Sequence, residues 1–341
     1  TTLGTPTTKW VKINNGESGF YRTSYSQELL ERLHSPILEK KIHHLDRLGI
    51  IRDLFALSEA GIIPTTDTLG FLSAYKNEDN YIVLSEIASS LSKIEQTFGS
   101  KNNTEYFNKL NIELFKPLFI QLGWDKKIDE KHTDTLLRSL AISRLGLSGE
   151  ISILKEARKK FNDFLKGKDL DPNIRTAVYA IVAKYGGIKE YKQLTNLYNK
   201  QNLHQEKNRI GISLGEFEDD KILCQVAEFA ISSNVRQQDS VGILSGIAVN
   251  PKGRMIWLKF MKYNWDTMLS RYGDGGYTLS RMIKAISNTS EEKHLKYFKE
   301  FIKTHKTPGA ERAVEQVLER IENNILWKNR DSKKIEKFFK E

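Results

Sequence analysis

Amphipathic helical stretches follow one another along most of this chain, and each is closed by a short turn that contains glycine or asparagine. In residues 43–61, Gly61 ends a stretch whose apolar side chains form one helical stripe: Leu45, Leu48, Ile51, Leu54 and Phe55. Comparable stretches recur roughly every 15 to 20 residues, a spacing typical of stacked antiparallel helix pairs. Because no strict repeat is visible, we predict an all-α fold of the degenerate HEAT- or armadillo-like α-solenoid type.

The opening stretch departs from this rhythm. Residues 10–15 alternate as they would in a β-strand, with Trp10 and Lys12 on the same side, and the chain turns at residues 16–19. We therefore predict a short N-terminal β-strand lead-in. A strand without a sheet leaves two interpretations: the glycines form a phosphate loop, or the strand belongs to a domain outside this chain. The stretch G-E-S-G lacks the phosphate-loop pattern and does not open a helix, which disfavours the first.

Length and composition set outer limits. The chain has 341 residues, 39% of them hydrophobic, which suffices for one large or two ordinary domains. No apolar run approaches the roughly 20 residues needed to cross a bilayer, so we expect no membrane span, and the N-terminus lacks the apolar core of a signal peptide. The one cysteine, Cys224, rules out an internal disulfide, fits a reducing, cytoplasmic compartment and is expected in the core.

The net charge is +10, and most of the excess lies in the last quarter of the chain. A basic face of this kind can attract nucleic acid, anionic membranes or acidic peptides. The aromatic residues of the same quarter could stack on bases, but Trp257, Met261 and Trp265 share one helical stripe and are better explained as core. Nucleic acid is therefore an improbable partner, and solvated helix surfaces explain the charge.

No catalytic constellation is visible. Zinc hydrolysis on a helix needs two histidines one turn apart with a glutamate nearby. None of the histidines is followed by glutamate, and no two have the spacing i, i+4; they are His34, His43, His44, His132, His204, His294 and His305. We predict no catalytic residue and no metal site in this chain, and no catalysis by the chain alone.

Several motifs together resemble one family, the zinc aminopeptidases of the aminopeptidase N type (gluzincins). The similarity is to their C-terminal helical domain, as in the endoplasmic-reticulum aminopeptidases and the tricorn-interacting factors. The motifs follow in family order: WVKINNGESGFYRTSYSQELLERL, LDRLGIIRDLFALSEAG, NIRTAVYAIVAKYGG, NPKGRMIWLKFMKYNWDTMLSRYG, LSRMI and ERAVEQVLERIENNILWKN. Each motif is weak by itself, but their order across almost the whole chain makes the resemblance strong.

The resemblance implies a domain organisation. Residues 1–25 would be the lead-in from an upstream β-sandwich domain, and residues 26–341 one helical solenoid domain, a curved bowl of antiparallel helix pairs. The zinc would lie in an upstream catalytic domain, and the bowl would enclose peptide substrates whose N-terminal residues are removed. The partners would then be these two upstream domains and the peptides. The alternative is a non-catalytic helical-repeat scaffold that binds a protein or nucleic acid on its concave face.

The resemblance also points to substrate-binding residues. Arg281 lies in LSRMI, which is similar to the family's L-x-R-x-I stretch, where the arginine of some members faces the substrate cavity. The local pattern allows this role, because Arg281 falls off the expected buried stripe of Leu279, Met282, Ile283 and Ile286. Tyr277, one turn earlier, could line the same surface. The alternative is an ordinary solvated arginine, or one that bridges to an acid on a neighbouring helix.

Overall fold

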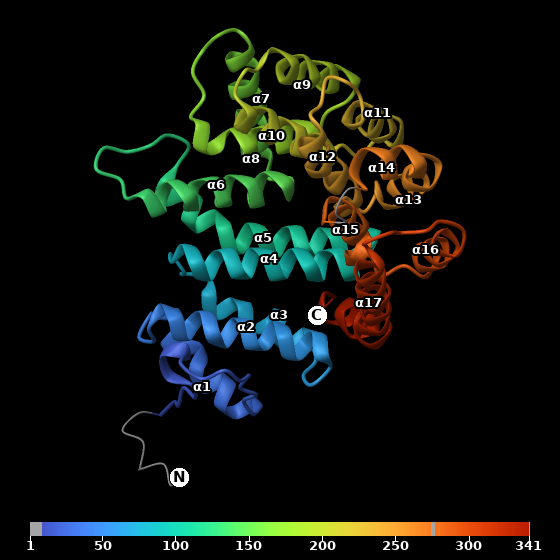
Figure 1. The fold of residues 1–341 in the computed structure, drawn as a ribbon. Coiled ribbons are helices and arrows are strands. Elements are labelled where there is room, and N and C mark those ends of the chain that lie inside the picture. The colour runs from blue at the N-terminus through green and yellow to red at the C-terminus, as the bar shows by residue number, and fades with distance from the viewer. Residues whose placement is uncertain (1–8, 274–276, 341) are drawn as a thin grey trace. The chain divides into compact units, whose positions relative to one another are not determined.

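The computed structural model describes residues 9–273 and 277–340, and every regular element in these ranges is a helix (Figure 1). The prediction of an all-α fold is thereby confirmed. The chain divides into two compact units. Among the described residues, unit 1 comprises 9–95, 99–148 and 329–340, and unit 2 comprises 96–98, 149–273 and 277–328.

Unit 1 is built from a short series of helices around a leucine- and isoleucine-rich core. It holds the 3₁₀ turns η1 (Asn15–Glu17) and η2 (Leu72–Tyr75), the α-helices α1 (Gln27–Leu38), α2 (His44–Ala60), α3 (Thr65–Phe71), α5 (Lys101–Leu122) and α6 (His132–Leu147), and most of α4 (Tyr81–Phe98). The helices α5 and α6 pack against each other. Gly61 ends α2 in the left-handed conformation, φ 78°, as the sequence predicts.

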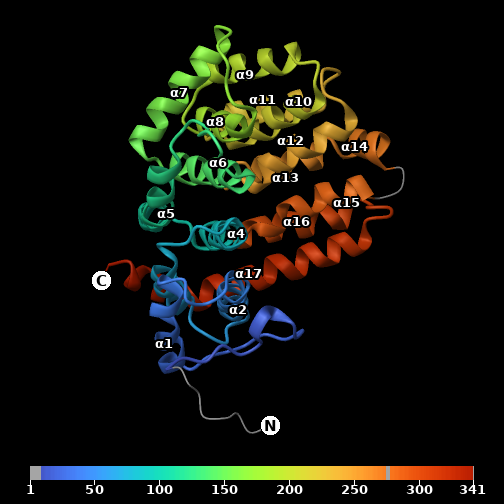
Figure 2. The ribbon, with the colours of Figure 1, turned by 90° about the vertical axis from the view of Figure 1, so that its left-hand side faces the viewer.

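Unit 2 continues with shorter helices. These are α7 (Ile151–Leu165), α8 (Pro172–Lys184), α9 (Ile188–Lys200), α10 (His204–Ser213), η3 (Leu214–Glu216), α11 (Asp220–Ala230), α12 (Gln237–Val249), α13 (Arg254–Tyr263), α14 (Trp265–Tyr272), α15 (Tyr277–Lys284), η4 (Ala285–Asn288), α16 (Glu292–Thr304) and most of α17 (Glu311–Phe338). Helix α10 packs on α8 and α12, α12 on α13, and α13 on α16 (Figure 2). The backbones of η3 and α12 touch, because a Cβ on Gly215 would lie 2.5 Å from the carbonyl carbon of Gly246.

The predicted N-terminal strand is wrong: residues 9–26 contain no strand and form a loop around η1. Asn14 and Gly16 take φ values of 59° and 71°, which break the extended alternation. A strand also needs a partner for its backbone, whereas here side chains satisfy it: Ile13 N–H donates to the Tyr25 hydroxyl (3.0 Å), and Gly16 N–H donates to Asp46 (2.7 Å). The glycines are turn residues.

This loop is tied to α2 by charges in a confined space. Lys12 Nζ lies 2.7 Å from Glu17 Oε1 and 3.7 Å from Asp46 Oδ1. The Glu17 carboxylate sits directly over Gly49, where a Cβ would lie 1.9 Å from Glu17 Oε1. The absence of a side chain at Gly49 therefore makes room for the carboxylate, and the contact depends on glycine at that position.

Burial follows the predicted stripes with one exception. Trp257, Met261 and Trp265 are buried in the core of unit 2, as their helical spacing indicates. Cys224 is exposed, so its predicted place in the core is wrong. Helix α11 turns Leu223, Val226, Ala227 and Ala230 inward, and Cys224 falls beside this stripe. The apolar residues around Cys224 therefore did not make Cys224 itself a core residue.

The solenoid arrangement, and the boundary at residue 25 between a lead-in and a single helical domain, stay predictions. No helix of the described part of the chain combines the length and the apolar character that a bilayer crossing requires.

Candidate functional site

The two residues that the resemblance singles out lie together on α15. The buried face of α15 carries Leu279, Met282 and Ile283, and Ile286 is buried in η4 just beyond it, as predicted. Arg281 is exposed, and Tyr277 is 74% exposed. The guanidinium carbon of Arg281 lies 6.0 Å from the centre of the Tyr277 ring, within the range of a cation–π contact.

This pair can bind an anion. Arg281 is exposed and, among the residues that the structure describes, makes no ion pair. A guanidinium stays charged at any physiological pH and can hold a carboxylate through two parallel hydrogen bonds. The aromatic ring limits the orientations of the guanidinium and offers an apolar surface beside it. The roles of Arg281 and Tyr277 as substrate-binding residues stay predictions.

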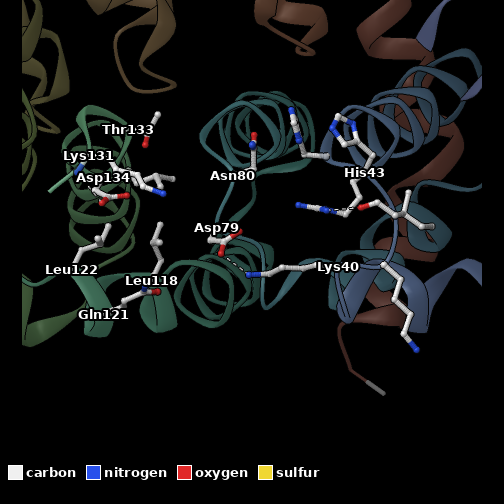
Figure 3. A pocket seen from close by; sticks show the side chains of 15 residues that line it. Lys40, His43, Asp79, Asn80, Leu118, Gln121, Leu122, Lys131, Thr133 and Asp134 are labelled. Atoms are coloured by element: carbon white, nitrogen blue, oxygen red, sulfur yellow. Dashed lines mark hydrogen bonds and ion pairs between the residues drawn. The ribbon is translucent and has the colours of Figure 1, made fainter. Parts of the chain in front are cut away.

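Unit 1 contains a second candidate site, a groove of about 750 Å³ that the sequence did not reveal. It is lined by the loop before α2, the residues before α4, the end of α5 and the start of α6 (Figure 3). The lining residues are Lys40, Lys41, Ile42, His43, His44, Arg47, Asp79, Asn80, Leu118, Gln121, Leu122, Lys131, Thr133, Asp134 and Leu137.

A buried ion pair shapes one side of this groove. Arg47 donates to both oxygens of Glu78, at 2.7 and 2.8 Å, and to the carbonyl oxygen of Ile42 at 2.6 Å. Glu78 in turn accepts from the backbone N–H groups of Asp79 (3.1 Å) and Asn80 (2.9 Å). One side chain pair thus fixes both the loop that precedes α2 and the residues that precede α4.

A second buried ion pair shapes the opposite side. The Arg138 side chain is fully buried and binds Glu130 through two nitrogens, while it also donates to the carbonyl oxygens of Gly123 (3.1 Å) and Leu122 (3.2 Å). Hydrogen bonding from Arg138 lowers the pKa of Glu130 to about 2. The loop between α5 and α6, which ends at Lys131, is therefore held by a carboxylate that stays ionised down to strongly acidic pH.

The remaining charges of the groove are mostly basic. Lys40 forms an exposed ion pair with Asp79 (2.6 Å). The rings of His43 and His44 lie 4.1 Å apart between centres. Lys131 is exposed and, within the described ranges, pairs with no carboxylate. The run Lys40-Lys41-Ile42-His43-His44 was a visible signal in the sequence, but nothing there indicated that residues near 80, 120 and 131 lie beside it.

Metal chemistry has no visible basis in the residues described. No three side chains among His, Cys, Asp and Glu lie together as metal ligands would in residues 9–273 and 277–340. The rings of His43 and His44 are tilted by 40° to each other. The fold and these surfaces therefore define the class of the chain as an all-α domain with exposed cationic sites.

Comparison with known proteins names the family. The family model described as "ERAP1-like C-terminal domain" matches residues 10–323, and the chain belongs to this family. Aminopeptidase M1 of Arabidopsis thaliana is 32% identical over 331 residues, which cover 94% of this chain and 37% of that protein. Puromycin-sensitive aminopeptidase of Caenorhabditis elegans is 28% identical over 299 residues, 86% of this chain and 32% of that protein.

A third relative extends the pattern. Alanine/arginine aminopeptidase of Saccharomyces cerevisiae is 27% identical, with 98% of this chain and 39% of that protein covered. The chain thus spans somewhat more than a third of the length of most of these relatives. The resemblance to the C-terminal helical domain of aminopeptidases is confirmed.

Proposed function

We propose that this chain acts as the C-terminal, substrate-enclosing domain of a zinc-dependent aminopeptidase that removes N-terminal residues from peptides. The observation that carries this proposal is the match of residues 10–323 to a C-terminal domain family, together with full-length relatives that are named aminopeptidases. The same relatives favour this function over a non-catalytic scaffold.

The zinc belongs to an upstream catalytic domain in this proposal, and the chain contributes binding. A peptide held at the zinc by its N-terminus extends its tail away from the reacting bond. Arg281, with Tyr277 beside it, binds a carboxylate of that tail and thereby fixes the position of the peptide; the zinc of the catalytic domain would supply the activation of water. We also propose the upstream β-sandwich domain as a partner and the cytoplasm as the compartment, since a single cysteine fits reducing conditions.

The test is the substitution Arg281→Ala in an enzyme that contains this chain together with its catalytic domain. The expected result is a roughly tenfold fall in kcat/KM for peptides with acidic tails, which corresponds to about 1.4 kcal/mol of lost transition-state binding. A single-residue chromogenic amide has no tail to hold, so its kcat/KM should fall much less.

Two further variants sharpen the result. Arg281→Lys keeps the charge but loses the two-pronged geometry. Its kcat/KM for peptides with acidic tails should lie between those of the unchanged enzyme and of Arg281→Ala. Lys296→Ala removes an exposed cation of α16 and should leave all substrates unchanged. An equal loss on peptides and on the amide would remove Arg281 from substrate binding. Failure of the assembled enzyme to cleave any amino-terminal residue would overturn the proposed function itself.

A further inference from the structure

Unit 1 contains another groove, of about 660 Å³, which α1 and α3 line from two sides. We call it the α1–α3 groove; helices α1, α2 and α3 lie close together in Figure 1. Gln27, Glu31 and Ser35 of α1 are spaced one turn apart, as are Thr66 and Gly70 of α3, so each helix turns one face toward the groove. A cavity of this volume is in the range of small-molecule sites.

Part of the groove wall is apolar surface that a ligand could cover. Leu54, Leu57 and Phe71 line the groove, but they are buried core residues and expose little surface. The apolar surface that is open to a ligand comes mainly from Phe338, which is 37% exposed, and from the half-buried Leu30. Removal of such surface from water favours binding of a ligand with an apolar body.

The charged groups of the lining are acidic. They are Glu31 on α1 and Asp67 on α3, and among the described residues no lysine or arginine lines the groove. Both carboxylates are exposed, and neither makes an ion pair within the described ranges. Glu31 accepts a hydrogen bond from the Gln27 amide at 3.1 Å, and Asp67 accepts one from the Thr66 hydroxyl at 3.4 Å. Both therefore keep lone pairs for a cation.

Basic residues on the same helices do not line the groove. Arg32 of α1 forms its ion pair with Glu28 of the same helix. The last turns of α17 carry several lysines, but Phe338 is the residue of α17 that lines the groove, and Lys334 lies 3.7 Å from Asp331. The lining thus combines two carboxylates with an exposed aromatic ring, and such a combination favours cations.

Gly70 leaves space beside the exposed ring. A Cβ at Gly70 would lie 3.8 Å from two ring carbons of Phe338, which is an ordinary van der Waals contact. Alanine would therefore fit at this position, whereas a longer side chain would occupy space next to the ring. Because Gly70 is exposed and lies within α3, a leucine there can be introduced without strain in the helix backbone.

We propose that the α1–α3 groove binds a small organic cation, an ammonium group attached to an aromatic body. The ammonium pairs with Glu31 or Asp67, and the aromatic body covers Phe338 and Leu30. A bare metal cation would leave the apolar surface in water, and a neutral apolar molecule would gain nothing from the carboxylates. This binding does not depend on aminopeptidase activity, and it uses a surface different from that of Arg281 on α15.

The experiment measures binding to the 341-residue chain by saturation-transfer NMR titration, at about pH 8, where ordinary histidines are mostly uncharged. The probes are tryptamine and tryptophol, which share the indole ring and differ in an ammonium or a hydroxyl group. The expected result is saturable binding of tryptamine and roughly fivefold weaker binding of tryptophol, as for exposed charge pairs. The double variant Glu31→Gln, Asp67→Asn should bind both probes equally. Equal binding of both probes to the unchanged chain would overturn the proposal.

Two single variants test the position of the site. Glu336→Gln removes an exposed carboxylate of α17 outside the lining and should change the affinity for tryptamine by about twofold or less. Gly70→Leu fills the space beside Phe338 and should weaken both probes by roughly tenfold. A loss in Glu336→Gln equal to that in Glu31→Gln, or unchanged binding in Gly70→Leu, would overturn the proposal. General attraction cannot imitate the result, because the net charge of +10 repels cations.

Other occupants of the groove would give different results. If a labelled helical peptide of leucine and lysine binds in a way that Gly70→Leu abolishes, while tryptamine does not bind, the groove accepts a basic helix and the proposal is wrong. Dimers in light scattering that Gly70→Leu abolishes, again without tryptamine binding, would assign the groove to a second copy of the chain. A thermal melt of each variant, followed by circular dichroism, confirms that binding is compared between folded chains.

Discussion

The buried arginines of the two units differ in how they are partnered. In unit 1, Arg138 is fully buried, and Glu130 and two backbone carbonyl groups bind its guanidinium. In unit 2, Arg254 is 3% exposed, and its only hydrogen bond donates to the carbonyl oxygen of Gln96 at 3.4 Å, while Nε and Nη2 have no partner in the described part of the chain.

The electrostatic consequences are opposite. Arg138 lowers the pKa of Glu130 to about 2, which means that the folded protein favours the charged pair. Burial lowers the pKa of Arg254 to about 10, which means that the folded protein disfavours its charge; Glu291, which pairs with Lys328, only partly offsets this. A buried arginine therefore keeps its charge at a lower cost where a carboxylate and carbonyl groups surround it, and removal of such a partner is costly.

The largest expected effect comes from breaking the partnered site. Glu130→Gln keeps the shape of the side chain but leaves the buried guanidinium without a counter-charge. The free energy of unfolding should fall by about 3 kcal/mol, the range for loss of one partner of a buried pair. Urea denaturation followed by circular dichroism measures this. Glu113→Gln, an exposed carboxylate of α5 outside any ion pair in the described ranges, should change stability by less than about 0.5 kcal/mol. Equal effects of the two variants would contradict the comparison.

The two units should also differ in how their stability depends on pH. Burial lowers the pKa of His294 in unit 2 to about 4, and its Nδ1 lies 2.7 Å from the Thr289 hydroxyl. An unfolded histidine takes up a proton near pH 6.5, so between pH 6.5 and 4 the unfolded state binds more protons, and stability falls as pH falls. The loss should reach on the order of 3 kcal/mol.

Glu130 of unit 1 affects stability at a lower pH than His294 does. The pKa of Glu130 is lowered, so its stabilisation is complete above about pH 4.5 and is lost only as pH falls toward 2. Protection against hydrogen exchange, taken relative to the intrinsic exchange rate at each pH, should therefore fall first in α16, near pH 5, and later in α5 and α6. His294→Gln should flatten the dependence of stability on pH between pH 6.5 and 4. An unchanged slope would mean that other groups cause the loss of stability.

A smaller effect is expected from removing the unpartnered charge. Arg254→Met retains most of the apolar volume and removes a cation that the fold disfavours. Stability should stay the same or rise by about 1 kcal/mol, whereas Arg138→Met should lower it by about 3 kcal/mol because Glu130 then loses its partner. Both are measured by denaturant unfolding at pH 7.5. Similar destabilisation by the two substitutions would show that Arg254 is as well compensated as Arg138.

The smallest effect should come from the exposed arginine of α15. Arg281→Ala removes a side chain that faces solvent and touches Tyr277 at the edge of cation–π range. The melting temperature should shift by no more than about 1 °C, since exposed substitutions usually lie within 0.5 kcal/mol. Leu279→Ala, on the buried stripe of the same helix, should lower stability by about 3 kcal/mol. A large shift for Arg281→Ala would point to a structural role.

Helical periodicity predicted the local features well. The stop of α2 at Gly61, the core stripe of Trp257 and Met261, and the exposed position of Arg281 all follow from a period of 3.6 residues. The prediction of a strand before α1 failed because alternation over six residues says nothing about whether a partner strand exists. Side chains of Tyr25 and Asp46 took the place of that partner.

The sequence by itself determined that the chain forms amphipathic helices and which face of most of them is buried, because both depend on neighbours within a few residues. Only the tertiary structure decided that Glu130 meets Arg138, while no carboxylate of the described residues pairs with Arg254. It alone also brought Lys40, Asn80, Leu122 and Lys131 to one groove. The physical reason is that a charge is stabilised by whatever lies within a few ångströms in space, and those groups are set by how helices pack rather than by their order along the chain.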